Sequence, residues 1–276
     1  LNTVGNPCPV VDRQTGTIWL PMTRNLGIDK QSDIVAGTSK GTREAWIAKS
    51  IDDGLTWSKP IEITAHVKAP NWRWFATGPG VGIQLRSGRL VIPRDYSIAG
   101  KSVEHAFVMF SDDGGATWKS GGSTEENCGE AQVVELSDGS LLMNMRHVGG
   151  GKNRRTALSR DGGLTWGAVF DDKTLVDPGC QGSLVKATAT TRGSGHRLFF
   201  SNPASVKRER LALRFSDDDG KTWSAERVLH AGPAAYSCAT VLPNGSVGVM
   251  FEGGDKGAYE RLRFVAMPAS WAAGLP

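Results

Sequence analysis

Short runs in which apolar and polar side chains alternate recur along the chain, and turn residues separate them. Three of these runs are residues 45–50, 106–111 and 211–216. Alternation with a period of two residues predicts a β-strand that packs one face on a core. Helical periodicity is confined to a short terminal turn expected at residues 268–273. The pattern therefore predicts an all-β protein.

A second recurring signal is a glycine-containing turn followed by an apolar run. It occurs five times, at residues 14–20, 86–92, 137–143, 193–200 and 243–250. Short loops that contain glycine and join two alternating segments are typical of β-hairpins. The chain is therefore expected to form five hairpins, each at an equivalent place in a repeat.

An eight-residue stretch, Ser-x-Asp-x-Gly-x-Thr-Trp, follows four of the five hairpins. Its copies are residues 50–57, 111–118, 159–166 and 216–223. Ser and Asp can bond to nearby backbone N–H groups, and Gly supplies a positive φ, so the stretch predicts a tight turn. The Thr then re-enters a strand, and the Trp ring is expected to be buried against the next sheet.

Together the two signals define one repeat: strand, Gly turn, strand, loop, strand, box, strand. Self-similarity at about 50 residues indicates a repeat architecture, and a four-stranded antiparallel meander is the blade of a β-propeller. A β-sandwich would also contain short strands at regular spacing, but not an identical turn at matching places. The sequence predicts a β-propeller with about five blades.

Composition excludes several classes of protein. The 276 residues are 39% hydrophobic and 22% charged, which is ordinary for a globular protein. The net charge of +4 comes with no run of Lys and Arg, so nucleic-acid binding is disfavoured. No apolar stretch reaches the ~18 residues of a membrane span.

The cysteines lack metal-ligand spacing, and no metal or cofactor is expected for the chain. They are expected to be small buried residues, although a disulfide between distant blades stays open. The four are Cys8, Cys128, Cys180 and Cys238. The acidic residues of the repeated stretch are expected to close turns rather than to bind calcium.

The repeated stretch resembles the Asp box of the sialidase (neuraminidase) family, and the resemblance extends over essentially the whole chain. Further family-like segments follow in the family's order. They are residues 5–12, 75–80, 179–183, 201–204, 235–237, 241–245 and 251–254. The resemblance implies a sialidase-like propeller. Propellers of this family have six blades, of which about five are expected in this chain. It also implies an exo-α-sialidase that releases terminal sialic acids with retention of configuration.

The resemblance places the catalytic pair at Tyr236 and Glu130. A phenol with its ordinary pKa near ~10 is a poor nucleophile and needs a base, a role that Glu130 would fill. An uncharged nucleophile also avoids repulsion by the carboxylate of the substrate, and sialidases depart in this way from the two-carboxylate scheme of glycosidases. Without these roles, the two would be a hydrogen-bonded core Tyr and a surface Glu.

The resemblance further assigns Arg146 and Arg208 to a cluster of three arginines that holds the substrate carboxylate. Guanidinium groups suit this task because they bind a planar carboxylate bidentately. Arg210 and Arg214 are weaker candidates. Glu252 matches the glutamate that orients the first arginine of the cluster.

Five more residues are candidates for the rim of the site, near the acyl and glycerol arms of the sugar. They are Trp72, Arg73, Trp74, Asp95 and Tyr96. The two tryptophans fit a blade core equally well. Asp95 and Tyr96 are expected in a loop.

The chain departs from the family at its start. The Arg-Ile-Pro motif, which carries the first arginine, and the acid/base Asp belong to a first blade that is not found here. We therefore expect a single domain, residues 1–276, that is incomplete at its N-terminus, either as a fragment or as a natural truncation. Glu252 should then be solvated or paired differently, and turnover should be weak or absent.

Two other functions stay open. The chain could be a non-catalytic propeller that binds sialic acid through Arg146 and Arg208. It could instead transfer sialic acid in the manner of a trans-sialidase, or act on a related nonulosonic acid. A sialylated glycan is the expected partner, with no nucleic acid, membrane span or specific protein inferred. A secreted or cell-surface location is favoured, because glycans of this kind lie there.

Overall fold

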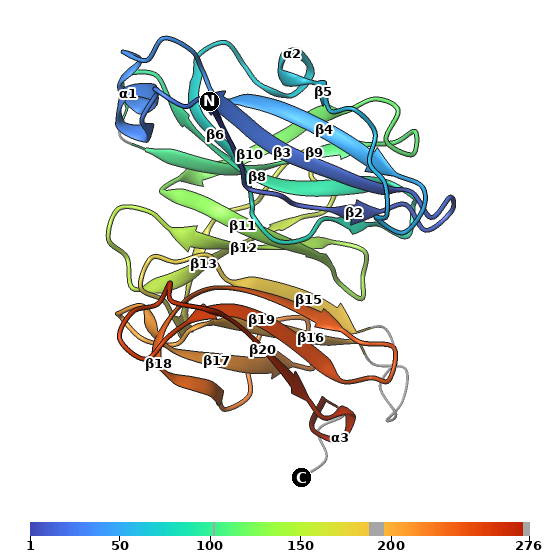
Figure 1. Cartoon of the computed structure of the whole chain (residues 1–276). Coiled ribbons are helices and arrows are strands. Elements are labelled where there is room, and N and C mark those ends of the chain that lie inside the picture. Colours follow the sequence, from blue (N-terminus) through green and yellow to red (C-terminus); the bar gives the residue numbers. More distant parts are fainter. Residues whose placement is uncertain (102, 188–195, 273–276) are drawn as a thin grey trace. The chain divides into compact units, whose positions relative to one another are not determined.

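The computed structural model describes residues 1–101, 103–187 and 196–272, and it confirms the predicted all-β architecture (Figure 1). The described residues form 20 strands and three short helices. The helices are α1 (Gln31–Ala36), α2 (Thr64–Val67) and α3 (Ala269–Ala272). Residues 193–195 of the fourth predicted hairpin lie outside the described residues.

The strands form four antiparallel sheets in which most neighbours in sequence are neighbours in space, as a meander requires. The first sheet joins β1 (Asn2–Gly5), β3 (Ile18–Leu26), β4 (Glu44–Ser50) and β5 (Ile61–Glu62), with β2 (Val10–Val11) on β3. The second joins β10 (Lys119–Glu126), β9 (Glu104–Ser111), β8 (Leu90–Ile98) and β6 (Trp72–Thr77), with β7 (Ile83–Gln84) on β8. The third joins β11 (Cys128–Glu135), β12 (Leu141–His147), β13 (Asn153–Ser159) and β14 (Phe170–Val176). The fourth joins β15 (Ser183–Ala187), β16 (Arg197–Pro203), β17 (Glu209–Ser216), β18 (Arg227–Val241), β19 (Val247–Gly253) and β20 (Leu262–Met267).

Strand β18 explains why five predicted repeats give four sheets among the described residues. It is 15 residues long, and its two halves pair with different neighbours. Residues 227–233 pair with β17, and residues 234–241 pair with β19. The fifth repeat, which has no Asp box, is therefore joined to the fourth through a shared strand.

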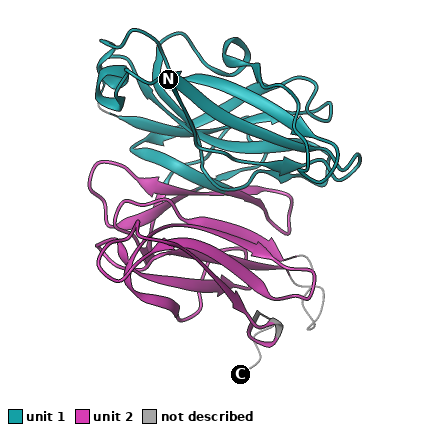
Figure 2. Ribbon diagram, in the orientation of Figure 1, with its two compact units in different colours: residues 1–132, 157–169 teal, residues 133–156, 170–276 magenta. Residues whose placement is uncertain are grey.

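The chain divides into two compact units, each with its own core (Figure 2). Unit 1 comprises residues 1–132 and 157–169, and unit 2 comprises residues 133–156 and 170–276. In unit 1, the apolar faces of β8 and β9 meet in a cluster that includes Leu90, Ile92, Phe107 and Met109. In unit 2, apolar residues of β16 to β19 form the corresponding cluster. Burial extends beyond what alternation predicts, because residues on both faces of β8 and of most of β9 are buried.

All four Asp boxes are turns closed by their own side chains, as predicted. In the second box, Asp113 Oδ1 accepts hydrogen bonds from the hydroxyl of Ser111 (2.7 Å) and from the backbone N–H of Thr117 (2.8 Å). Asp113 Oδ2 accepts from the Thr117 hydroxyl at 2.6 Å, and the same bonds recur in the other three boxes. Burial of the last residue is less regular, since Trp118 is 5% exposed but Trp57 is 43% exposed. The prediction that each of these rings is buried is therefore wrong for Trp57.

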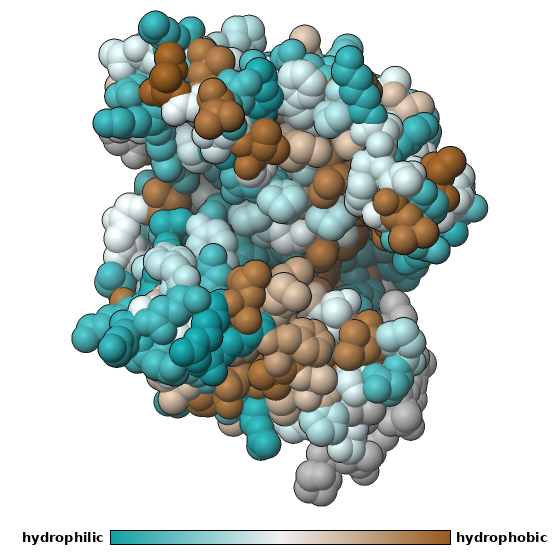
Figure 3. Space-filling view, viewed as in Figure 1, coloured by the Kyte–Doolittle hydropathy of each residue, from teal (hydrophilic) through white to brown (hydrophobic). Residues whose placement is uncertain are grey.

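Both units keep large apolar side chains at the surface, and Figure 3 shows brown hydrophobic residues among teal hydrophilic ones on the viewed face. On β20, Leu262 and Phe264 lie on the same side of the strand and are both exposed. No disulfide joins the cysteines of the described residues; three are buried, as predicted, and Cys238 is exposed. In the part of the chain that the structure describes, no helix is long and apolar enough to cross a membrane.

Candidate active site

Tyr236, the predicted nucleophile, lies in a β-bulge of β18. Ala234 pairs with Gly253 of β19 and Ser237 pairs with Phe251, so β18 has one extra residue between these two pairs. A bulge breaks the alternation of a strand and changes the direction of the side chains that it carries. The half-buried Tyr236 packs against a small buried cluster that includes Cys180, a residue of the loop between β14 and β15.

Glu252 is bonded to the same bulge. Its Oε2 accepts a hydrogen bond from the backbone N–H of Tyr236 at 3.0 Å. This bond gives the carboxylate of Glu252 a donor within unit 2. Because the bond ends on the backbone of Tyr236, Glu252 helps to hold the bulge in place.

Arg208 immediately precedes β17 and lies beside Tyr236. The centre of its guanidinium is 5.5 Å from the centroid of the Tyr236 ring. Its Nη1 donates a hydrogen bond to the hydroxyl of Tyr259, and its Nη2 donates to the carbonyl of Gly179 at 3.4 Å. Partial burial acts to lower the pKa of Arg208, but Cys180, Tyr259 and Tyr236 raise it by more, so Arg208 remains a cation.

Arg146, at the end of β12, borders the same loop. Its Nε lies 4.0 Å from the point that a Cβ on Gly179 would occupy. Gly179 has φ of +76°, a conformation that favours glycine. One glycine thus lies next to both predicted carboxylate-binding arginines, and unit 2 brings together Arg146, Arg208 and Tyr236.

The two weaker arginine candidates are engaged elsewhere in unit 2. Arg214 donates to Glu226 Oε2 at 2.8 Å, and Arg210 donates to Glu226 Oε1. A shared carboxylate neutralises part of the charge of both guanidinium groups. The geometry therefore favours Arg208 over its two neighbours as a ligand for an anion.

Glu130, the predicted base, lies on β11 in unit 1, where it is half-buried and interacts electrostatically with Asp95 of β8. Asp95 is 1% exposed, and its Oδ1 accepts no hydrogen bond from any described residue. Burial raises the pKa of Asp95 well above its usual value. The negative charges of Glu104 and Glu130 add to this rise, and Arg43 and Arg94 oppose it. Unit 1 thus contains a second cluster of ionisable groups.

Arg43 and Arg94 act on Asp95 of this cluster, and Lys68 interacts electrostatically with both of these arginines. Burial lowers the pKa of Arg94 to about 9, of Arg43 to about 10 and of Lys68 to about 8. Arg43 donates to Asn6 Oδ1 at 2.6 Å, and its guanidinium lies 3.8 Å from the centroid of the Trp74 ring. None of these three cations was singled out from the sequence, because no motif marks them.

The predicted rim residues belong to unit 1, and two of them are placed differently from the prediction. Asp95 and Tyr96 lie on strand β8 rather than in a loop. The Tyr96 ring is buried and stacks on Trp72 at a centroid distance of 3.7 Å, so this pair belongs to the core of the unit. Trp74 lies beneath Arg43, and Arg73 approaches Gly37 with its Nε 3.2 Å from the point that a Cβ would occupy.

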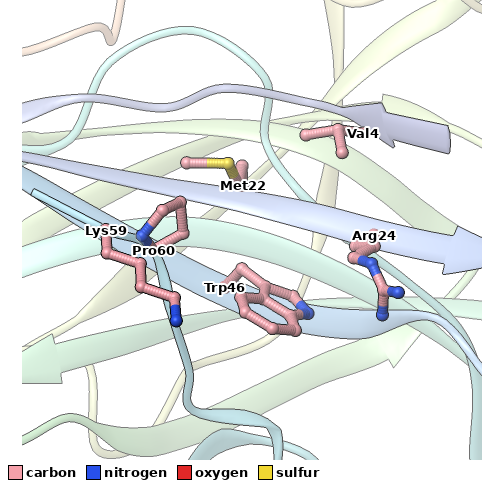
Figure 4. Close-up of a pocket in the computed structure, with 6 residues that line it drawn as sticks. All are labelled: Val4, Met22, Arg24, Trp46, Lys59 and Pro60. Atoms are coloured by element: carbon pink, nitrogen blue, oxygen red, sulfur yellow. The ribbon is translucent and has the colours of Figure 1, made fainter. Parts of the chain in front are cut away.

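Unit 1 also carries a pocket of about 260 Å³ on the first sheet (Figure 4). Its lining residues are Val4, Met22, Arg24, Trp46, Lys59 and Pro60. The guanidinium of Arg24 lies 5.3 Å from the centroid of the Trp46 ring. None of the predicted site residues lines this pocket. Among the described residues, no group of three or more His, Cys, Asp or Glu could hold a metal ion.

Two unit 2 residues contact the site without having been predicted from the sequence. Tyr259 bonds to Arg208, and the Oε1 of Gln181 accepts from the backbone N–H of Ser237 at 3.1 Å. Gln181 belongs to the family-like segment at residues 179–183, which was a usable signal for it. Tyr259 lies in an exposed turn with no motif of its own.

Known proteins resemble the chain over nearly all of its length. The BNR repeat-like domain family matches residues 1–249. A sialidase of Bacteroides fragilis (strain YCH46) is 36% identical over 91% of this chain and 48% of that protein. A sialidase of Micromonospora viridifaciens is 35% identical over 98% of this chain and 42% of that protein. Sialidase-3 of Mus musculus is 30% identical over 94% of this chain and 74% of that protein.

A solved structure supports the same assignment. The Hadza microbial sialidase Hz136 has a TM-score of 0.88 and 33% identity, over 98% of this chain and 53% of that chain. An intramolecular trans-sialidase from Ruminococcus gnavus, at 18% identity and a TM-score of 0.79, is similar in fold.

These matches and the four closed Asp boxes define the class as the sialidase-like β-propellers with BNR repeats, as predicted. The chain belongs to the sialidase family. It spans about half the length of the first relatives that it matches, at 48% and 42%.

Proposed function

We propose that this chain carries the sugar-binding and nucleophile-bearing part of an exo-α-sialidase, which releases terminal sialic acid from glycans. The observation that carries the proposal is the arrangement in unit 2. There the Arg208 guanidinium lies 5.5 Å from the Tyr236 ring, beside the loop that Arg146 also borders. The relatives named sialidases support the same substrate class.

In the proposed reaction, Arg146 and Arg208 bind the carboxylate of the sugar through charge-assisted hydrogen bonds. Glu130 removes the phenolic proton of Tyr236, and the phenolate oxygen attacks the anomeric carbon as the bond to the leaving group breaks. Water then hydrolyses the tyrosyl–sugar intermediate, and the configuration is retained. Glu252 keeps the backbone of Tyr236 in place through its bond to the N–H.

The test is turnover of a fluorogenic α-sialoside by the wild-type chain and by two variants. Tyr236→Phe should abolish any turnover, including the weak turnover expected of this chain, while sugar binding persists, because it removes only the nucleophilic oxygen. Tyr96→Phe is the matched control; it also removes one phenolic oxygen, which in this case bonds to Ser123 Oγ at 3.0 Å, and it should leave turnover unchanged.

Other outcomes would contradict the proposal in distinct ways. Turnover that survives Tyr236→Phe would exclude this nucleophile. Sialic acid binding by the wild type without turnover would indicate a binding propeller. Formation of sialyllactose when lactose is added as acceptor would indicate a transferase. If the wild-type chain neither binds sialic acid nor turns over the substrate, the proposed site does not exist in this chain.

A further inference from the structure

The loop between β14 and β15, residues 177–182, contacts three of the proposed site residues of unit 2. Its Gly179 carbonyl accepts a hydrogen bond from Arg208. Its Cys180 belongs to the buried cluster against which Tyr236 packs. Arg146 lies 4.0 Å from the position of a Cβ on Gly179. Any change in the path of this loop therefore displaces groups that the proposed reaction uses.

The loop has no regular secondary structure, and the carboxylate of Asp177 determines its turn. Asp177 Oδ1 accepts hydrogen bonds from the backbone N–H groups of Gly179 and Cys180, both at 2.8 Å. Asp177 Oδ2 accepts from Asn202 Nδ2 at 3.1 Å. An Asp side chain that bonds to N–H groups two and three residues later closes a turn locally. The conformation at Gly179 thus depends on where this carboxylate is held.

Arg154 of β13 holds both ends of the turn. Its Nη1 donates to Asp177 Oδ2 at 3.4 Å and to the carbonyl of Cys180 at 2.5 Å. Its Nε donates to Asn144 Oδ1 on β12 at 2.7 Å, which ties the guanidinium to the sheet. The side chain of Arg154 is 0% exposed and that of Asp177 is 1% exposed. Water is therefore excluded from the contact between these two charges.

A buried ion pair contributes little net stability once the cost of dehydrating both charges is counted. The planar fork of an arginine can nevertheless fix several acceptors in one geometry, which a lysine cannot do. In unit 2 the acceptors that Arg154 fixes are the carboxylate of Asp177 and the backbone carbonyl of Cys180, both in the 177–182 loop. The geometry of this pair thus fits positioning better than stabilisation.

We propose that Arg154 and Asp177 are positioning residues, which act through the 177–182 loop to hold Arg208 and Tyr236 in their working arrangement. The consequence for ligand binding rests on the proposed function. The coupling between Arg154 and the two side chains does not depend on that function, and it is tested separately.

The three tyrosines of the chain, Tyr96, Tyr236 and Tyr259, allow a test that needs no turnover. With ¹³C-labelled tyrosine, the full chain should give three ring signals, assigned by replacing each Tyr with Phe. In Arg154→Lys, which keeps the charge but loses the fork, the signals of Tyr236 and Tyr259 should shift because both rings contact Arg208. The signal of Tyr96, in the core of unit 1, should stay in place and serves as the internal reference.

Arg197→Lys is the matched control. Arg197 is another buried arginine of unit 2, and its fork binds Asp217 of the fourth Asp box, with both bonds at 2.6 Å. All three tyrosine signals should keep their wild-type positions in this variant. If Arg154→Lys does not fold, Asn202→Ser takes its place, because it removes one donor to Asp177 Oδ2 and should shift the same two signals by less.

The second measurement is the affinity for N-acetylneuraminate by calorimetry. Arg154→Lys should weaken it on the order of 10- to 100-fold, the effect of losing one hydrogen bond to a charged group, and Arg197→Lys should not. Unchanged Tyr236 and Tyr259 signals in Arg154→Lys would overturn the proposal, and so would wild-type affinity in that variant. A wild-type chain that binds no sugar would contradict the proposed function instead, and the tyrosine signals would then decide the coupling alone.

Discussion

Arg154 in unit 2 and Arg94 in unit 1 are both fully buried, yet their surroundings differ in kind. Arg154 donates to a carboxylate, an amide oxygen and a backbone carbonyl. Arg94 lies 4.0 Å from the centroid of the Phe75 ring, and its Nη1 contacts the sulfur of Met109 at 3.2 Å. Its Nε and Nη2 have no hydrogen-bond acceptor among the described residues.

The distance to a carboxylate along the chain does not explain this difference. Asp95 follows Arg94 directly, but consecutive residues of a strand point to opposite faces of the sheet, so the pair cannot close a hydrogen bond. Asp177 is far from Arg154 in sequence, and yet the two side chains meet because β13 and the 177–182 loop converge in unit 2. A bonded ion pair thus depends on the tertiary structure, and a neighbouring charge in sequence is no substitute for it.

The largest expected effect is on the free energy of unfolding when each of the two arginines is replaced by methionine. Arg154→Met leaves Asp177 buried without its cation and should lower the free energy of unfolding by about 3–5 kcal/mol. Arg94→Met removes two buried donors that have no acceptor among the described residues and should raise that free energy by about 1–3 kcal/mol. Urea unfolding followed by tryptophan fluorescence measures both. Equal losses in the two variants would show that the missing acceptors of Arg94 do not matter.

A smaller effect concerns the acid beside Arg94. The pKa of Asp95 is raised by burial and by Glu104 and Glu130, so above about pH 4 the folded chain keeps a proton that the unfolded chain has lost. The contribution of Asp95 to stability therefore falls as the pH rises from about 4 through its raised pKa. Asp95→Asn should remove this slope.

The measurement for Asp95→Asn is the melting temperature of the variant and of the wild type, followed upward in pH from about 4, the ordinary pKa of an Asp carboxyl. The melting temperature of the variant should rise relative to that of the wild type as the pH rises. A difference between the two proteins that stays constant across this range would mean that Asp95 is ionised in the folded state throughout.

The smallest effect lies at the Asp boxes, where the pKa of an aspartate is lowered rather than raised. The side chain and the backbone N–H of Thr117 bond to Asp113 and lower its pKa to about 2. Its stabilising contribution is thus complete above about pH 4 and is lost as the pH falls toward 2. Thr117→Val should cost about 0.5 kcal/mol at neutral pH, because the bond is exposed. The cost should disappear near pH 2; a cost independent of pH would point to packing of the Thr methyl group instead.

Residues that act within one repeat could be predicted from the sequence. Each Asp box closes its turn with bonds among residues at most four apart, so its pattern alone determines its geometry. Strand alternation likewise predicted the strand at residues 106–111, although both faces of that strand are buried. Tyr236, Arg208 and Arg146 were predicted from family-like motifs, and unit 2 places all three around one loop.

Contacts between residues on different strands could not be predicted, because they have no local pattern. The pairing of Arg214 and Arg210 with Glu226 depends on how β17 and β18 pair after a register shift. The shared strand β18 merged two predicted repeats into one sheet. Tyr259 reached Arg208 from a turn that no motif marks.

The sequence by itself determined the repeat, its turns, the class of fold and the motifs that carry Glu130, Arg146, Arg208 and Tyr236. These depend on short-range bonds and on the two-residue period of a strand, which are legible in the order of residues. Only the tertiary structure decided which buried charges are bonded. Arg154 bonds to Asp177, which lies 23 positions later in the chain. Arg94 and Asp95 are adjacent in the chain, but the strand that carries both directs their side chains to opposite faces of the sheet.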